Sequence, residues 1–253
     1  MDRLIFNASA SMRERAVDWR LMTHDLSNVS TVGFKRSFDL ATQAMKAVGT
    51  GFESRSQPQG RYTDRVQTDA GPMMSTGREL DVAMLDRTVL AVQAANGEVA
   101  FTRRGDLRVN VNGALETGAG HLVLGDAGGI TVPQGFRVRI NPDGSVVAAD
   151  PAQPGPPAEQ VVGRLRLRDA GNASLSRRED GLLAVSDQPP GTDITNGTGV
   201  PGVATGMLEG SNVSAVAALT RLIDHSRSFE LQVKVVKEAR DIDQSGAALL
   251  KLG

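Results

Sequence analysis

Few residues in this chain could carry out acid–base, nucleophilic or metal chemistry. The chain has 253 residues and no cysteine, which removes disulfides, thiolate metal sites and a cysteine nucleophile. Its three histidines, His24, His121 and His225, lack the i,i+4 spacing of a helical zinc site. The glycine-rich stretches 118–121 and 125–129 lack the Lys-Ser/Thr pair of a phosphate-binding loop, and there is no Gly-x-Ser-x-Gly motif. We therefore expect no enzyme, and no catalytic, cofactor-binding or metal-binding residues.

Bulk charge and hydropathy exclude further classes of function. The chain has 28 basic and 29 acidic residues and a net charge of −1, so no global field attracts nucleic acid. No segment approaches the roughly 18 apolar residues of a membrane span. The N-terminal residues include charges at positions 13, 14 and 15, where a secretory signal would be apolar. We expect no nucleic-acid or small-molecule partner and no direct membrane insertion.

The two ends of the chain are the first elements that the sequence predicts. All 11 prolines lie between Pro58 and Pro201, and 26 of the 28 glycines lie between Gly33 and Gly210. Apolar residues recur with a heptad pattern over 2–29 and at spacings of three and four after residue 211, which predicts a helix at each end. Because such seams are unstable alone, the helices pair either with each other or with other subunits. The residues expected to form this assembly interface are Ile5, Met12, Trp19, Leu26, Leu222, Phe229, Val233 and Val236.

The middle of the chain has the alternating pattern of β-strands. Residues 107–111 and 136–140 alternate apolar and polar side chains, and Asn-Gly or Asp-Gly turns follow at 112–113 and 143–144. Arg103 and Arg104 are assigned to solvated strand faces, with charged outer contacts as the alternative. The predicted fold class is α+β, with long N- and C-terminal helices, a coiled-coil-like assembly region, flanking a mainly antiparallel β domain. The expected segments are an N-terminal assembly helix with its motif at 1–36, an extended linker at 37–75, the β domain at 76–185, an extended return segment at 186–208 and a C-terminal assembly helix at 209–253.

Four blocks in order along the chain resemble the bacterial flagellar rod and hook proteins. They are His24–Lys35, Gly77–Ala83, Phe101–Leu107 and Gly206–Val213. The first resembles the signature Asn-Leu-Ala-Asn-x-x-Thr-x-Gly-Phe-Lys, and the last resembles Leu-Glu-x-Ser-Asn-Val. The matching motif residues are Leu26, Asn28, Thr31, Gly33, Phe34, Lys35, Leu208, Glu209, Ser211, Asn212 and Val213. We expect Gly33 to supply a positive φ at the helix exit, and Ser211 or Asn212 to cap the second helix or to contact a neighbouring subunit.

The resemblance implies a structural role. It points to a subunit of the periplasmic flagellar rod, a drive shaft that transmits torque from motor to hook, with no cofactor. The partners implied are the adjacent proximal and distal rod proteins and the flagellar type III export apparatus, which exports such subunits without a cleaved signal peptide. Residues 226–234 resemble the proximal rod subunits more than the distal ones. The alternatives are a distal rod or hook-type subunit of the same family, or a monomeric β-domain binding module.

Overall fold

The chain folds into two compact units, which differ in their secondary structure. The computed structural model describes residues 2–37, 41–46, 56–61, 65–152, 159–195, 197 and 199–250. Unit 1 combines Met1–Ser27, Asp39–Thr63 and Ser214–Gly253, and unit 2 combines Asn28–Phe38 and Asp64–Val213. The chain therefore passes from one unit to the other near both of its ends, next to the two terminal motifs.

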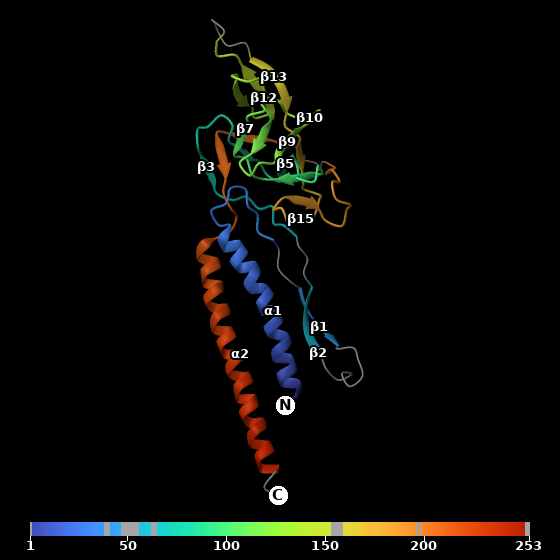
Figure 1. Ribbon diagram of the computed structural model, residues 1–253, viewed down its shortest axis with the longest axis vertical. Helices are drawn as coiled ribbons and strands as arrows, with labels where there is room; N and C mark the ends of the chain where they lie inside the picture. Colours follow the sequence, from blue (N-terminus) through green and yellow to red (C-terminus); the bar gives the residue numbers. More distant parts are fainter. Residues whose placement is uncertain are drawn as a thin grey trace. The chain divides into compact units, whose positions relative to one another are not determined.

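In its described residues, unit 1 contains two helices and one pair of β-strands. The helices are α1 (Asp2–Ser27) and α2 (Ala215–Leu250), which pack against each other (Figure 1). The hairpin pairs β1 (Ala41–Lys46) with β2 (Ser56–Arg61) antiparallel. Ser214 caps α2, because its Oγ accepts a hydrogen bond from the Ala217 N–H at 3.4 Å and its carbonyl accepts one from Ala218 at 2.9 Å. None of the helices in the described part of the chain is both long and apolar enough to span a bilayer.

The predicted fold class is wrong. We expected long terminal helices, packed as a coiled-coil-like region, to flank a mainly antiparallel β domain. Instead, α1 and α2 group with the β1–β2 hairpin in unit 1, and the mainly antiparallel β domain forms unit 2 together with both terminal motifs. A coiled-coil-like region is not shown, because large apolar side chains of α2 are exposed on several sides of the helix and are not all covered in one seam. The exposed large apolar side chains of α2 are Val216, Leu219, Ile223, Phe229, Leu231, Val235 and Ile242.

Unit 2 is built from short, mainly antiparallel strands. Its largest sheet has the order β15-β16-β6-β5-β9-β8-β7, with β10 added on β9 and β14 on β5. The remaining strands form a β11-β12-β13 sheet and the pairs β17-β4 and β18-β3. The strands are β3 (Met73–Ser75), β4 (Val82–Met84), β5 (Thr88–Gln93), β6 (Val99–Thr102), β7 (Leu107–Val109), β8 (Leu115–Thr117), β9 (Leu122–Gly125), β10 (Gly128–Gly129), β11 (Arg137–Ile140), β12 (Ser145–Ala149), β13 (Glu159–Arg164), β14 (Leu167–Asp169), β15 (Leu175–Arg177), β16 (Leu183–Val185), β17 (Val203–Thr205) and β18 (Met207–Glu209).

Strand β5 is the centre of unit 2. Its sequence, TVLAVQ, is a continuous apolar run rather than an alternating one, and its first five residues are buried. Leu90 and Val92 face one apolar core, and Val89 and Ala91 face a second one. Strand β5 pairs with β6, β9 and β14, so the main chains of these three strands are hydrogen-bonded to a buried central strand.

The predicted hairpin turns are confirmed. The Asn-Gly turn at 112–113 joins β7 to β8, and the Asp-Gly turn at 143–144 joins β11 to β12. In β11 the two arginines are exposed while Val138 and Ile140 are buried, as the alternation indicates.

Candidate functional site

The N-terminal motif forms a tight turn after α1. The Thr31 N–H donates to the Asn28 carbonyl at 3.1 Å, and the Thr31 hydroxyl donates to Asn28 Oδ1 at 3.1 Å. Gly33 follows with a φ of 68°, as predicted, and its N–H donates to the Glu209 carbonyl at 2.8 Å. A Cβ at position 33 would lie 2.4 Å from the Arg103 carbonyl carbon and oxygen, so only glycine fits there.

The two motifs, which are more than 170 residues apart in the sequence, meet in a buried ion cluster. Lys35 Nζ lies 2.7 Å from Glu209 Oε1, and Arg103 Nε lies 2.8 Å from Glu209 Oε2. The Lys35 side chain is 1% exposed, and the Arg103 and Glu209 side chains are 0% exposed. A buried charge is costly unless it is paired and hydrogen-bonded, so the remaining donors and acceptors of these groups also need partners.

Main-chain groups supply those partners. Lys35 Nζ also donates to the Asp69 carbonyl at 2.7 Å, and Glu209 Oε1 accepts from the Gly71 N–H at 3.0 Å. The Arg103 guanidinium is held by three further main-chain carbonyls at 2.7–3.0 Å, those of Met84, Asp86 and Thr88. Strands β4 and β5 and the turn between them therefore orient Arg103 toward Glu209.

The environment shifts two pKa values in the cluster. Burial lowers the pKa of Lys35 below its ordinary value, and the charge of Arg103 adds to this, while the hydrogen bond to Glu209 opposes it. Burial alone would raise the pKa of Glu209, but the hydrogen bonds and charges of Arg103 and then Lys35 outweigh burial and leave that pKa lowered. Glu209 is therefore held as a carboxylate between two cations.

Asn212 makes a second connection between the motifs. Its N–H donates to the Phe34 carbonyl at 3.3 Å, and its Oδ1 accepts from the Arg36 N–H at 2.7 Å. Its Nδ2 donates to the Gln67 carbonyl at 3.2 Å. The side chain of Asn212 thus bridges chain segments and does not cap α2; the capping residue is Ser214. Ser211 does not cap the helix either, because its Oγ accepts a hydrogen bond from the Val213 N–H at 3.2 Å within its own loop.

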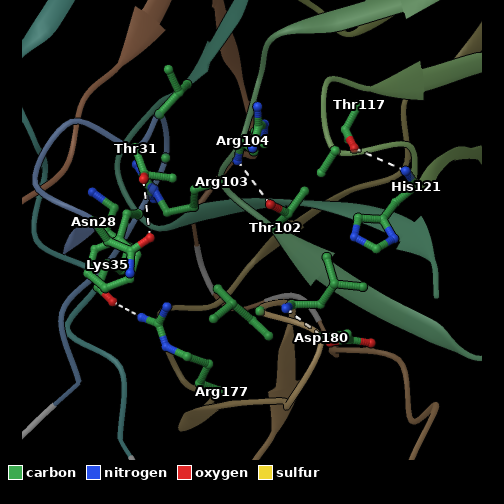
Figure 2. A pocket seen from close by; sticks show the side chains of 17 residues that line it. Asn28, Thr31, Lys35, Thr102, Arg103, Arg104, Thr117, His121, Arg177 and Asp180 are labelled. Carbon is green, nitrogen blue, oxygen red and sulfur yellow. Dashed lines mark hydrogen bonds between the residues drawn. The ribbon is translucent and has the colours of Figure 1, made fainter. Parts of the chain in front are cut away.

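A pocket of about 140 Å³ lies beside this junction. Figure 2 shows Asn28, Thr31 and the Lys35 backbone on one side of it and His121 on the other. The Arg177 guanidinium stacks on the Phe34 ring, 4.2 Å from its centroid, and donates to the Lys35 carbonyl. These contacts hold the N-terminal turn on the end of β15 rather than leaving it as a free loop.

The predicted assembly residues recur at spacings of three, four and seven along α1 and α2, so they share one face of each helix. Met12, Leu26, Leu222, Val233 and Val236 are half-buried, and the side chain of Ile5 lies outside the described residues. Trp19 and Phe229 are 41% and 45% exposed and border an apolar groove between α1 and α2, together with Met12.

His225 joins the two helices at this groove. Its ring centroid lies 5.3 Å from that of Trp19, and its Nε2 is 2.9 Å from the Arg15 carbonyl oxygen. Of the other two histidines, His24 is exposed and His121 lines the pocket of Figure 2. Within the ranges that the structure describes, no three acidic or histidine side chains gather where they could hold a metal ion.

Arg103 is the residue whose role the sequence interpretation missed. We assigned it to a solvated strand face, whereas the structure buries it. The signal was present, because side chains two apart in a strand share a face, and Phe101 is fully buried. Arg104, on the opposite face, does have a partly exposed side chain, which pairs with Asp106 at 2.6 Å.

Comparison with known proteins gives concordant matches. The family described as "Flagellar hook protein FlgE/F/G D1 domain" matches residues 87–148, and "Flagellar basal body rod FlgEFG protein C-terminal" matches residues 204–249. The chain is 35% identical to the flagellar basal-body rod protein FlgF of Escherichia coli over 95% of each chain. It is 32% identical to FlgF of Salmonella typhimurium over the whole of both chains, and 29% identical to the rod protein FlgG of Caulobacter vibrioides over 96% of this chain and 97% of that protein.

Proposed function

The chain belongs to the flagellar basal-body rod protein family, as a structural subunit most like FlgF, and we propose that it occupies the proximal part of the rod. The observation that carries this proposal is the pair of full-length FlgF relatives at 32–35% identity; the compared FlgG relatives are 27–29% identical and further FlgF relatives 26–29%. The proposed role is mechanical. The subunit transmits torque through the periplasm from motor to hook.

The proposed partners are the neighbouring proximal and distal rod subunits, and the proposed contacts are apolar. Isolated helices with unpartnered apolar side chains gain stability when another chain covers them. On α2 the side chains of Leu231 and Val235 are 65% and 48% exposed, and Trp19 and Phe229 border the groove between α1 and α2. Together with the predicted interface residues, these side chains offer the surface that a neighbouring subunit would bury.

The proposed route to the periplasm is the flagellar export apparatus. Residues 2–15 carry eight charged or polar side chains, at positions 2, 3, 7, 9, 11, 13, 14 and 15, so no apolar run in this segment exceeds three residues. Ordering of α1 and α2 only when neighbours are present would defer the entropic cost of folding until assembly.

The test is a strain that lacks this gene, complemented with the intact gene. We expect the deletion strain to lose swimming in soft agar and to regain it on complementation. Purified hook–basal bodies from the complemented strain should contain the chain by mass spectrometry. A deletion strain that swims normally, or hook–basal bodies that lack the chain, would contradict the proposed function.

A further inference from the structure

The junction between the two motifs has the structure of a clamp. We use this name for the chain segments 28–37 and 206–213 together with the Lys35–Glu209–Arg103 cluster. The segments are joined directly through main-chain hydrogen bonds, from the Gly33 N–H to the Glu209 carbonyl at 2.8 Å and from the Asn212 N–H to the Phe34 carbonyl at 3.3 Å. Side chains reinforce these bonds in both directions, since Lys35 reaches Glu209 and Asn212 reaches the Arg36 N–H.

The clamp depends on the β domain for its geometry. Arg103, which follows β6, contacts Glu209 only because the carbonyls of Met84, Asp86 and Thr88 hold its guanidinium. The close approach of Gly33 to the Arg103 backbone adds a steric match that a side chain would prevent. Both segments therefore belong with unit 2, although they adjoin α1 and α2 in the sequence.

We propose that the clamp is a cooperative device: segments 28–37 and 206–213 order with the β domain and open together, independently of α1 and α2. The physical reason is shared contacts. Glu209 is the common partner of Lys35, Arg103 and the Gly33 N–H, so an opening that removes Glu209 leaves two buried cations without their carboxylate. Opening segment 206–213 alone therefore strands both Lys35 and Arg103, whereas opening the two segments together also releases Lys35 to solvent.

The clamp also has a consequence for how the two helices find each other. Ser27 ends α1 and Ala215 begins α2, so 187 residues separate the helices along the chain. Because the clamp holds Asn28 and Val213 in one folded unit, the terminal segments start from fixed points even before they are helical. Pairing of α1 with α2 then occurs at a raised effective concentration. The pairing of α1 with α2 is relevant to the proposed rod function, whereas the joint opening of the two clamp segments does not depend on that function.

Residue-resolved hydrogen exchange on the full-length monomer tests the proposal. The variant is Asn212→Ala, which removes the acceptor of the Arg36 N–H and leaves the acceptor of the Gly33 N–H in place. We expect both amides to exchange about tenfold to a hundredfold faster than in the unmodified chain, because two hydrogen bonds of the Asn212 side chain are lost. Amides of β5 should keep their protection, since the β domain stays folded.

A matched control is Asn110→Ala. Asn110 Oδ1 accepts from two backbone N–H groups, those of Asn112 and Ala114, but lies in the turn between β7 and β8. This variant should accelerate those two amides and leave Gly33 and Arg36 unchanged. The proposal is overturned if Asn212→Ala accelerates Arg36 alone, or if the 28–37 amides of the unmodified chain exchange at the rates of α1. Because hydrogen exchange is measured on the monomer, its result tests the clamp independently of the motility test of the proposed function.

Discussion

Replacing Gly33 by alanine should destabilise unit 2 far more than the same replacement at Gly77. Both glycines have a φ of 68°, so alanine suffers the same backbone strain at each position, about 1–2 kcal/mol. They differ in what the new Cβ would meet. At position 33 it would lie 2.4 Å from the Arg103 carbonyl, whereas at position 77 nothing lies within 4 Å. The pair of variants therefore separates close approach from backbone strain.

The size of the difference follows from the overlap. Ordinary contacts of a Cβ begin at 3.4 Å, so the turn at position 33 has to move by roughly an ångström away from Arg103. Such a shift also strains the 2.8 Å hydrogen bond from the Gly33 N–H to the Glu209 carbonyl. Overpacking of this kind costs about 1–3 kcal/mol. We expect Gly33→Ala to lower the free energy of unfolding by about 2–5 kcal/mol in total, and Gly77→Ala by about 1–2 kcal/mol.

The assay is thermal and urea unfolding of the full-length chain, followed by far-UV circular dichroism. Fluorescence of the single tryptophan, Trp19, would report on α1 in unit 1 and not on the β domain. At about 2–4 °C per kcal/mol for a domain of this size, the melting temperature of Gly33→Ala should lie roughly 2–12 °C below that of Gly77→Ala. Equal melting temperatures would refute the argument, because they would mean that the turn does not lie against Arg103.

Three further predictions concern the ion cluster and α2. Glu209→Gln should lower the free energy of unfolding by about 3–5 kcal/mol in urea unfolding, because it leaves Lys35 and Arg103 buried without a carboxylate; a loss below about 1 kcal/mol would contradict a dry cluster. The pKa of Glu209 is lower in the folded chain than its ordinary value of 4.5, so the unfolded chain binds more protons and stability falls as the pH drops below that value. The stability gap between the unmodified chain and Glu209→Gln should therefore narrow from pH 7 to pH 3, and a constant gap would exclude this linkage. Leu231→Gln should leave the circular dichroism of the monomer unchanged but reduce incorporation of the subunit into hook–basal bodies about tenfold or more. Burying a leucine side chain against a neighbouring subunit contributes about 1.5–3 kcal/mol, which this variant loses. The control Lys234→Gln, also exposed on α2, should incorporate normally.

Elements governed by local pattern could be predicted from the sequence. The Asn-Gly and Asp-Gly turns at 112–113 and 143–144 lie where the sequence placed them, because those residue pairs favour two-residue hairpin turns whatever surrounds them. The positive φ of Gly33 is equally local. The arrangement of the helices was not predictable in this way, since a heptad pattern indicates that apolar side chains need a partner but not which partner covers them.

The cluster could not be predicted, although its residues were singled out. Lys35 and Glu209 were both identified as motif residues, yet no local rule connects positions 174 apart in the sequence. Their pairing depends on the antiparallel pairing of β18 with β3 and on the approach of the 28–37 segment, which are both long-range features. Asp86 shows the same limit: it has a φ of 48°, and its carbonyl accepts a hydrogen bond at 2.7 Å from Arg103, which lies 17 positions away in the sequence.

A buried cluster with two cations and one carboxylate is not explained by stability alone. Replacing such groups by apolar residues of similar size is often neutral or stabilising in other proteins, whereas removing one partner is costly. The cluster does, however, favour one alignment of the 28–37 segment with the 206–213 segment. A shift of one residue would carry Lys35 away from Glu209 and leave the Lys35 ammonium buried without a carboxylate. A subunit whose two ends leave the same β domain needs that alignment to be unique, because it determines where each terminal segment begins.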